Sequence, residues 1–180
     1  MAQSDTNLSR LEEEAMMRII ERAEIEAAFD EDAALAAIED GFRSLHHGAV
    51  QLAEVGHLAF AEPPGDCHVK GGHVAGDDVF VFKVATSFYR NPERGLSSSN
   101  GFMMVMSAST GEPLALLQDR GWLTDVRTAL AGAIAARAIA RPGSTVLGVV
   151  GTGTQARMQA EAIRRHAGFG ALLIHGRDPA

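Results

Sequence analysis

The stretch VLGVVGTGTQAR, residues 146–157, constrains the fold more than any other part of the chain. A short apolar run leads into two closely spaced glycines, and a helix-forming segment follows. Gly151, Gly153 and Ala156 match G-x-G-x-x-A: the first glycine permits a tight turn, the second lets the backbone approach a pyrophosphate, and the alanine lets helix and strand pack closely. A second apolar run at 171–174 completes a β-α-β unit. The pattern predicts the opening of a dinucleotide-binding domain.

The helix after these glycines offers an anion site at its first N–H groups, at Thr154 and Gln155. About 20 residues past the glycines, such domains present an acidic side chain to the ribose 2′-OH. Gly176 has no carboxylate at that place, whereas Arg177 can meet a 2′-phosphate as a bidentate donor. The sequence therefore predicts binding of NAD or NADP and favours NADP, while Asp178 keeps NAD open.

The residues before this unit carry other patterns. Segment 31–48 has apolar residues at helical spacing, with Asp30 or Asp32 as a cap at its start. Period-two alternation runs through 67–89, and a second pair of apolar runs lies within 101–119, so each segment predicts a β-hairpin. This first region is predicted to be α+β with a substantially antiparallel sheet.

An Ala-rich helix, predicted from Thr124 as N-cap to about Ala140, separates the two regions. The expected fold class is therefore α/β, with an α+β N-terminal domain followed by the first β-α-β unit of a Rossmann domain. The predicted boundaries are 1–123 for the first domain (with 1–15 flexible), 124–141 for the connecting helix and 142–180 for the partial dinucleotide-binding domain.

Composition excludes several classes of function. The formal net charge is −7 and the chain has no cluster of basic and aromatic residues, so we expect no nucleic-acid partner. No apolar run approaches the roughly 20 residues that cross a bilayer, so no membrane contact is expected either. A single cysteine, Cys67, and a start without a secretory pattern favour the cytoplasm. The histidines lack the spacing of a metal site, so none is predicted.

From about Asp66 to its end, and more loosely back to Glu31, the chain resembles the ornithine cyclodeaminase/mu-crystallin family. The motifs that carry the resemblance are FKVATSFY, TDVRTALAGAIAARAIA and VLGVVGTGTQAR. The resemblance implies a homodimer in which the α+β N-terminal domain is the substrate and dimerisation domain. It also implies the use of NAD or NADP to convert an amino acid such as ornithine to proline with release of ammonia. The alternatives are an NAD(P)H-dependent reductase of cyclic imines such as pyrroline-2-carboxylate, and a non-catalytic crystallin-like or dimerisation fragment.

The resemblance also assigns residues one by one. Lys83 and Arg127 fall where the family binds the carboxylate of its amino- or imino-acid substrate, a role that suits a compact cation and a planar fork. The family's further carboxylate-binding arginine has no counterpart here, and Lys70 is the nearest substitute. Ser98 falls at the hydroxyl position near the nicotinamide, and Thr128 at a helix start where a cofactor phosphate can lie.

Thr154 and Gln155 match the family's pyrophosphate-binding pair. The family's catalytic aspartate lies past the position of Ala180, so the resemblance implies a C-terminally truncated member, and no catalytic residue is assigned. The sequence leaves open whether the 180-residue chain is itself an enzyme.

Overall fold

A computed structural model describes residues 17–176 of the chain. It contains two compact units, each built from two stretches of sequence. Unit 1 takes the chain up to Ala27 together with Val50–Arg120, and unit 2 takes Ala28–Ala49 together with the chain from Gly121. The mixed α/β fold class is confirmed. The predicted domain boundaries stay a prediction, and the segment 1–15 and Arg177 lie outside the described residues.

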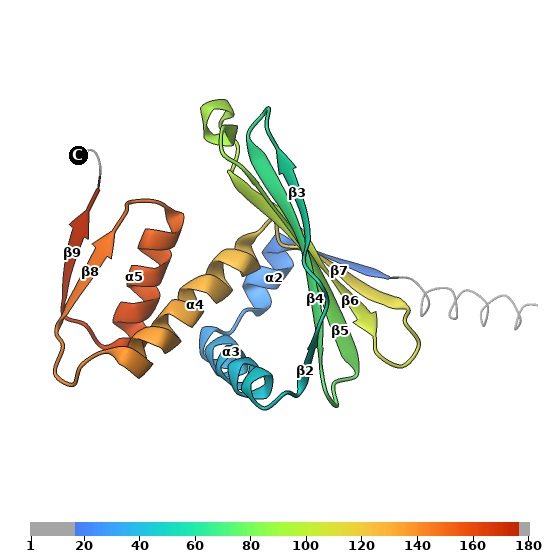
Figure 1. Cartoon of the computed structure of the whole chain (residues 1–180), viewed down its shortest axis with the longest axis horizontal. Coiled ribbons are helices and arrows are strands. Elements are labelled where there is room, and N and C mark those ends of the chain that lie inside the picture. Colours follow the sequence, from blue (N-terminus) through green and yellow to red (C-terminus); the bar gives the residue numbers. More distant parts are fainter. Residues whose placement is uncertain (1–16, 177–180) are drawn as a thin grey trace, which may run out of the picture. The chain divides into compact units, whose positions relative to one another are not determined.

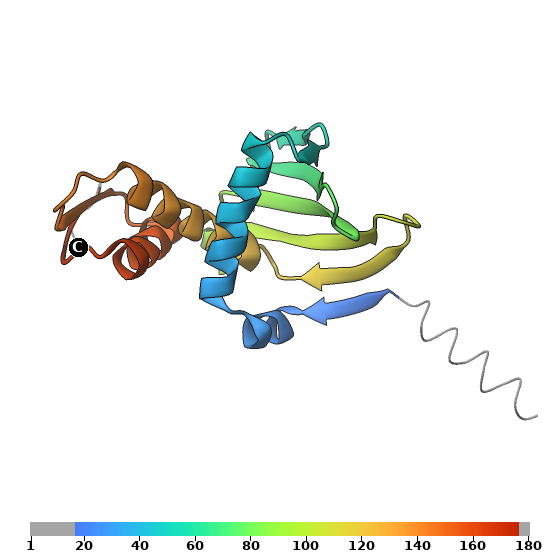
Figure 2. The same cartoon turned by 90° about the horizontal axis from the view of Figure 1, so that it is seen from below.

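Unit 1 is a seven-stranded sheet in the order β1-β7-β6-β5-β4-β2, with β3 also paired to β4. Figure 2 shows the strands side by side. The strands are β1 (Arg18–Glu21), β2 (Val50–Leu52), β3 (Gly56–Phe60), β4 (Gly65–Val74), β5 (Val79–Phe88), β6 (Ser99–Ser107) and β7 (Pro113–Gln118). A short helix α2 (Arg22–Ala28) follows β1, and a 3-10 helix spans Asn91–Arg94.

Both predicted hairpins are present. β4 and β5 pair antiparallel across the turn at residues 75–78, and β6 and β7 pair antiparallel around Gly111, whose φ is +75°. The sequence did not predict β1, β2 or β3. β1 pairs parallel to β7 at the sheet edge, so the sheet is antiparallel except at this pair.

The register gives the sheet two chemically different faces, because residues paired across neighbouring strands point to the same side. One line across the sheet joins Gly71, Phe82, Met104, Leu116 and Ile19, and the adjacent line joins Lys70, Lys83, Met103, Leu117 and Ile20. We call these the apolar face and the lysine face. On the apolar face, Phe82 is 38% exposed and Ile19 54% exposed.

Unit 2 combines three helices with a parallel pair of strands (Figure 1). They are α3 (Glu31–His46), α4 (Trp122–Ile139), β8 (Val146–Val150), α5 (Thr154–Ala167) and β9 (Ala171–His175). The helices enclose an apolar core that includes Leu35, Ala129, Leu130, Ala133 and Ala162. The predicted β-α-β unit is therefore present as β8-α5-β9.

The helix caps test the local predictions. Of the two predicted caps, Asp30 is the one that caps α3, since its carboxylate accepts a hydrogen bond from the N–H of Ala33 at 3.0 Å. The predicted cap of α4 at Thr124 is wrong: α4 begins at Trp122, after Gly121 in a left-handed conformation. The additional residues place Trp122 edge-on against Phe29, with ring centroids 5.0 Å apart. This tertiary contact explains the earlier start.

None of the helices within residues 17–176 combines the length and hydrophobicity that a membrane crossing requires.

Candidate cofactor and substrate site

The glycine turn between β8 and α5 has the backbone geometry that its sequence predicts. Gly151 has φ of +117°, a region that side chains rarely adopt. Its N–H donates a hydrogen bond to the carbonyl of His175 at 2.8 Å, which ties the turn to the end of β9. A Cβ built on Gly151 would lie 3.8 Å from the Cβ of Ala156, so the small alanine keeps this approach open.

Gly153 meets no packing demand from the described chain. Its φ of −80° suits any residue, and a Cβ built on it would meet no other protein atom within 4 Å. Gly153 is also the N-cap of α5 and supplies no side-chain cap, so the first N–H groups of the helix have no side-chain acceptor there. This uncapped, open helix start fits the pyrophosphate of a dinucleotide.

Thr154 and Gln155 differ in how the structure uses their side chains. Thr154 is exposed at the start of α5. Gln155 is half-buried, and its amide Nε2 donates to Asp125 Oδ1 at 2.9 Å and to the Asp125 carbonyl at 3.2 Å. The side chain of Gln155 therefore faces α4, and its main-chain N–H is the group at the turn.

Arg127 and Thr128 lie in the second turn of α4, because the helix begins at Trp122. Their predicted place at a helix start is therefore corrected. The Thr128 hydroxyl donates to the Thr124 carbonyl at 2.6 Å, while the Arg127 side chain is exposed. Arg127 therefore lies about one turn past the N-terminus of α4, where the helix-dipole potential, which is unfavourable for a cation, is weaker.

Lys70 and Lys83 are directly opposite each other on β4 and β5 and share the lysine face. Lys83 is half-buried and Lys70 is exposed. Like charges in such a cross-strand pair destabilise a sheet unless an anion lies near them. Ser98 is exposed just before β6, and its carbonyl accepts a hydrogen bond from Phe88 N–H at 2.8 Å. The structure thus brings the two lysines together within unit 1.

A polar cluster that the sequence analysis missed continues from Lys70 along β4. Tyr89 donates a hydrogen bond to Asp66 Oδ2 at 2.5 Å, and His68 Nε2 lies 3.6 Å from the other Asp66 oxygen. The hydrogen bond from Tyr89 lowers the pKa of Asp66, and the same bond raises the pKa of Tyr89. His57 stacks on His68, with ring centroids 4.5 Å apart. The alternation of polar residues at 66, 68 and 70 was the signal that could have revealed this cluster.

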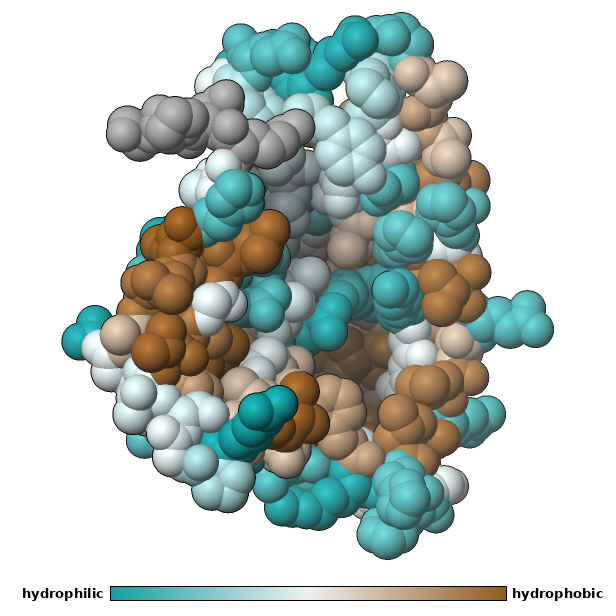
Figure 3. Space-filling model, turned by 60° about the vertical axis from the view of Figure 1, so that its left-hand side comes forward, coloured by the Kyte–Doolittle hydropathy of each residue, from teal (hydrophilic) through white to brown (hydrophobic). Residues whose placement is uncertain are grey.

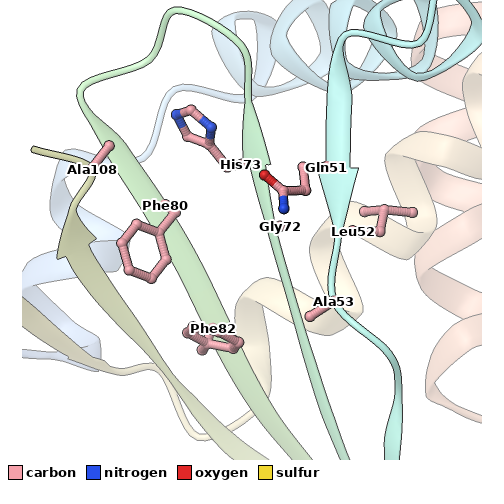
Figure 4. A pocket seen from close by; sticks show the side chains of 8 residues that line it. All are labelled: Gln51, Leu52, Ala53, Gly72, His73, Phe80, Phe82 and Ala108. Atoms are coloured by element: carbon pink, nitrogen blue, oxygen red, sulfur yellow. The ribbon is translucent and has the colours of Figure 1, made fainter. Parts of the chain in front are cut away.

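A pocket of about 330 Å³ lies elsewhere in unit 1, among β2, β4 and β5. Figure 4 shows Phe80 and Phe82 projecting from β5 toward it. The predicted site residues do not line it, and the His73 ring is engaged with the Asp77 carbonyl at 2.9 Å. Across residues 17–176, no group of three or more His, Cys, Asp and Glu side chains is arranged to hold a metal.

The β8-turn-α5-β9 arrangement is of the class that dinucleotide-binding proteins share. The model of the ornithine cyclodeaminase/mu-crystallin family matches residues 13–180, and the chain belongs to this family.

Three comparisons illustrate the relationship. A Rhizobium meliloti (strain 1021) protein with the provisional name of a dehydrogenase is 42% identical over 91% of this chain and 50% of its own length. The Delta(1)-pyrroline-2-carboxylate reductase of Bacillus thuringiensis subsp. konkukian (strain 97-27) is 34% identical over 68% of this chain and 37% of its own. An archaeal alanine dehydrogenase dimer with bound NAD has a TM-score of 0.81 and 33% identity, covering 89% of this chain and 48% of that one. The chain thus spans about half the length of these proteins or less.

Proposed function

We propose that the chain forms part of an NAD(P)-dependent enzyme of amino-acid metabolism that converts a diamino acid such as ornithine to a cyclic amino acid with release of ammonia. The observation that carries the proposal is Gly153: packing within the described chain does not require this glycine, whereas the approach of a pyrophosphate does. Membership of the family supports the reaction class. The acidic composition argues against a nucleic-acid partner. The single cysteine, Cys67, favours a cytoplasmic location.

Each candidate residue then has a role. The N–H groups of Gly153, Thr154 and Gln155 would hold the pyrophosphate at the positive end of α5. Thr128 and Ser98 would contact the cofactor. Arg177 would recognise a 2′-phosphate, which favours NADP, although the related archaeal alanine dehydrogenase carries NAD.

The cations would bind and orient the substrate. Arg127 would bind a carboxylate through its planar fork, and Lys83 and Lys70 would each supply a compact positive charge. A bound nicotinamide supplies the site that accepts and returns a hydride. Residues 1–123 would then form the substrate and dimerisation domain, 124–141 the connecting helix, and 142–180 the start of the cofactor domain.

Product analysis distinguishes this reaction from the second candidate, an NAD(P)H-dependent cyclic imine reductase, which the Bacillus thuringiensis relative favours. A cyclodeaminase releases ammonia from ornithine without net consumption of NAD(P)H. A reductase consumes one NAD(P)H for each pyrroline-2-carboxylate reduced. A protein that dimerises but neither binds cofactor nor forms product would contradict both and would support the crystallin-like, non-catalytic alternative.

We further propose that the chain forms a homodimer through the apolar face of unit 1. Phe82 and Ile19 on this face are substantially exposed, as are Leu58, Phe60, Val69 and Leu114. Exposed apolar area of this extent is typical of an interface. The related alanine dehydrogenase is a dimer. Sedimentation that shows a folded monomer at micromolar concentration would contradict this proposal.

A further inference from the structure

Gln155 contributes both to the first turn of α5 and to the contact between α5 and α4. Its main chain belongs to the first turn of α5, where the cofactor pyrophosphate would bind. Its side chain belongs to the contact with α4: the amide nitrogen donates twice to Asp125, and the amide oxygen accepts from Gln159 Nε2 at 3.3 Å. The whole amide is thus used within the α4–α5 pair, which leaves the main-chain N–H as the group for a phosphate.

Asp125 lies close in sequence to Arg127, the candidate carboxylate-binding residue. It lies two residues before Arg127, which corresponds to about 3 Å of helix rise. Further along, Gly132 leaves room for Gln159 of α5, because a Cβ built on Gly132 would lie only 2.7 Å from Gln159 Oε1. Buried Ala129 and Ala133 let the helices approach closely. The start of α5 is therefore tied by hydrogen bonds to Asp125, two residues before Arg127 in α4.

We propose that Gln155 is a positioning residue that couples cofactor binding at the glycine turn to carboxylate binding by Arg127. The inference rests on the proposed function, which assigns the two sites but no link between them. A pyrophosphate that accepts the Gln155 N–H holds the first turn of α5, and the Gln155 amide then holds Asp125 and the α4 turn behind it. Because coupling between two sites is reciprocal, a bound carboxylate tightens cofactor binding by the same factor.

Two pairs of variants isolate this link in the protein. Gln155→Met keeps the length of the side chain and removes both hydrogen-bonding groups. Asp125→Leu removes the acceptor, whereas Asp125→Asn keeps an Oδ1 that can still accept from Gln155. Arg157→Gln is the matched control, because Arg157 is exposed on α5 and pairs with Glu161. NADH affinity is measured by fluorescence titration, and hydrogen exchange reports the amides of 125–128 with and without NADH.

In the unmodified protein we expect NADH to slow exchange at 125–128 several-fold. Gln155→Met and Asp125→Leu should bind NADH within about 3-fold of the unmodified protein yet lose this slowing, and their KM for the amino-acid substrate should rise ~10-fold with little change in kcat. Asp125→Asn and Arg157→Gln should keep the response. A merely structural role would lower the melting temperature without separating KM from kcat.

Two results would overturn the inference. One is a loss of NADH affinity of ~10-fold or more in Gln155→Met but not in Asp125→Leu, because the side chain would then contact the cofactor directly. The other is an unchanged exchange response in both variants. If Gln155→Met does not fold, the two Asp125 variants decide the question. An unmodified protein that binds neither NADH nor NADPH saturably would refute the proposed function itself, and the inference with it.

Discussion

The two units of the chain bury their apolar side chains very differently. In the described residues, all six buried hydrophobic side chains lie in unit 2: Leu35, Ala129, Leu130, Ala133, Ala160 and Ala162. Unit 1 has the larger sheet, yet its buried residues with side chains are the polar Ser107 and Asp119. A helix cluster closes a core on itself, whereas a single sheet leaves a face that another surface must cover.

Unit 2 has an exposed area of its own. Leu172, Leu173 and Ile174 of β9, with Val146 and Val150 of β8, are between 46% and 86% exposed. In Figure 3, brown apolar side chains gather on the left of the view and in separate groups on the right. A pair of strands depends for its stability on packing against a helix or on further strands. Both units thus carry exposed apolar side chains on their strands, but only unit 2 also has buried hydrophobic side chains in the described residues.

The largest expected effect concerns the two cations, one in each unit, that we propose bind the substrate carboxylate. Arg127→Ala in unit 2 and Lys83→Ala in unit 1 should each lower kcat/KM. The loss of transition-state stabilisation calculated from kcat/KM should be about 2–4 kcal/mol, the usual cost of breaking a charge-assisted contact. Arg127→Lys should restore little, because an ammonium cannot reproduce the fork. Steady-state kinetics on the active protein measure this. Normal turnover with a lowered melting temperature in both variants would show that the residues are structural.

The association of two copies of the chain should depend on the apolar face of unit 1. Phe82→Asp should weaken the dimer by at least ~2 kcal/mol, or about 30-fold in Kd, because it places a charge among apolar side chains. Val55→Asp is the control, since Val55 is 56% exposed in the β2–β3 connection. Sedimentation velocity across a concentration series measures both. Equal dimer affinity in the two variants would place the interface elsewhere.

Alanine substitutions of two glycines, one in each unit, should affect different properties of the protein. A Cβ at Gly101 in unit 1 would lie 2.3 Å from the Val84 carbonyl oxygen, so Gly101→Ala should cost about 2–3 kcal/mol of unfolding free energy. Gly153→Ala in unit 2 should cost no more than about 1 kcal/mol of unfolding free energy, since alanine is a poorer N-cap than glycine. It should weaken NADH binding, because the methyl group would meet only the cofactor. Urea unfolding and NADH titration of both variants check this, and intact cofactor affinity in Gly153→Ala would remove the main support for the proposed function.

Arg120 in unit 1 has φ of +54°, the only positive value at a non-glycine among the described residues. Arg120→Gly should raise the unfolding free energy by about 1 kcal/mol, since glycine adopts this conformation without the Cβ conflict. Thermal unfolding of the two proteins measures the difference. A lower melting temperature in the variant would mean that the arginine side chain makes a compensating contact.

The smallest effect is a pH dependence in unit 2. Burial raises the pKa of Glu31, but hydrogen bonds from His166 at 2.8 Å and from Arg165 outweigh it and hold the pKa below its usual 4.5. A lowered folded-state pKa stabilises the fold above pH 4.5, and the contribution is lost as pH falls through the folded value. Glu31→Gln should therefore cost up to about 1 kcal/mol near neutral pH and nothing in stronger acid. A variant deficit that persists in stronger acid would contradict this.

The local parts of the fold were predictable from the sequence. The helix of α3 with its Asp30 cap, the two hairpins and the β8-α5-β9 unit all follow from short-range periodicity and capping chemistry. The chemistry of the glycine turn was equally local, because Gly151 acts through its positive φ and Gly153 through its lack of a side chain. The site assignments at Lys83, Lys70 and Arg127 depended on resemblance and stay predictions.

Other features depend on residues that are distant in the sequence. β1 becomes a strand through its parallel pairing with β7, and α4 gains its first residues through the contact of Trp122 with Phe29. The side chain of Gln155 turns to Asp125, which lies 30 positions earlier. A short segment or a single polar side chain has several local conformations of nearly equal free energy. The conformation that it adopts is selected by contacts with residues that only tertiary folding brings near. The sequence by itself therefore determined the local elements and the cofactor turn, and tertiary contacts decided where α4 starts, which face of the sheet stays apolar and open, and how the turn joins the helix of Arg127.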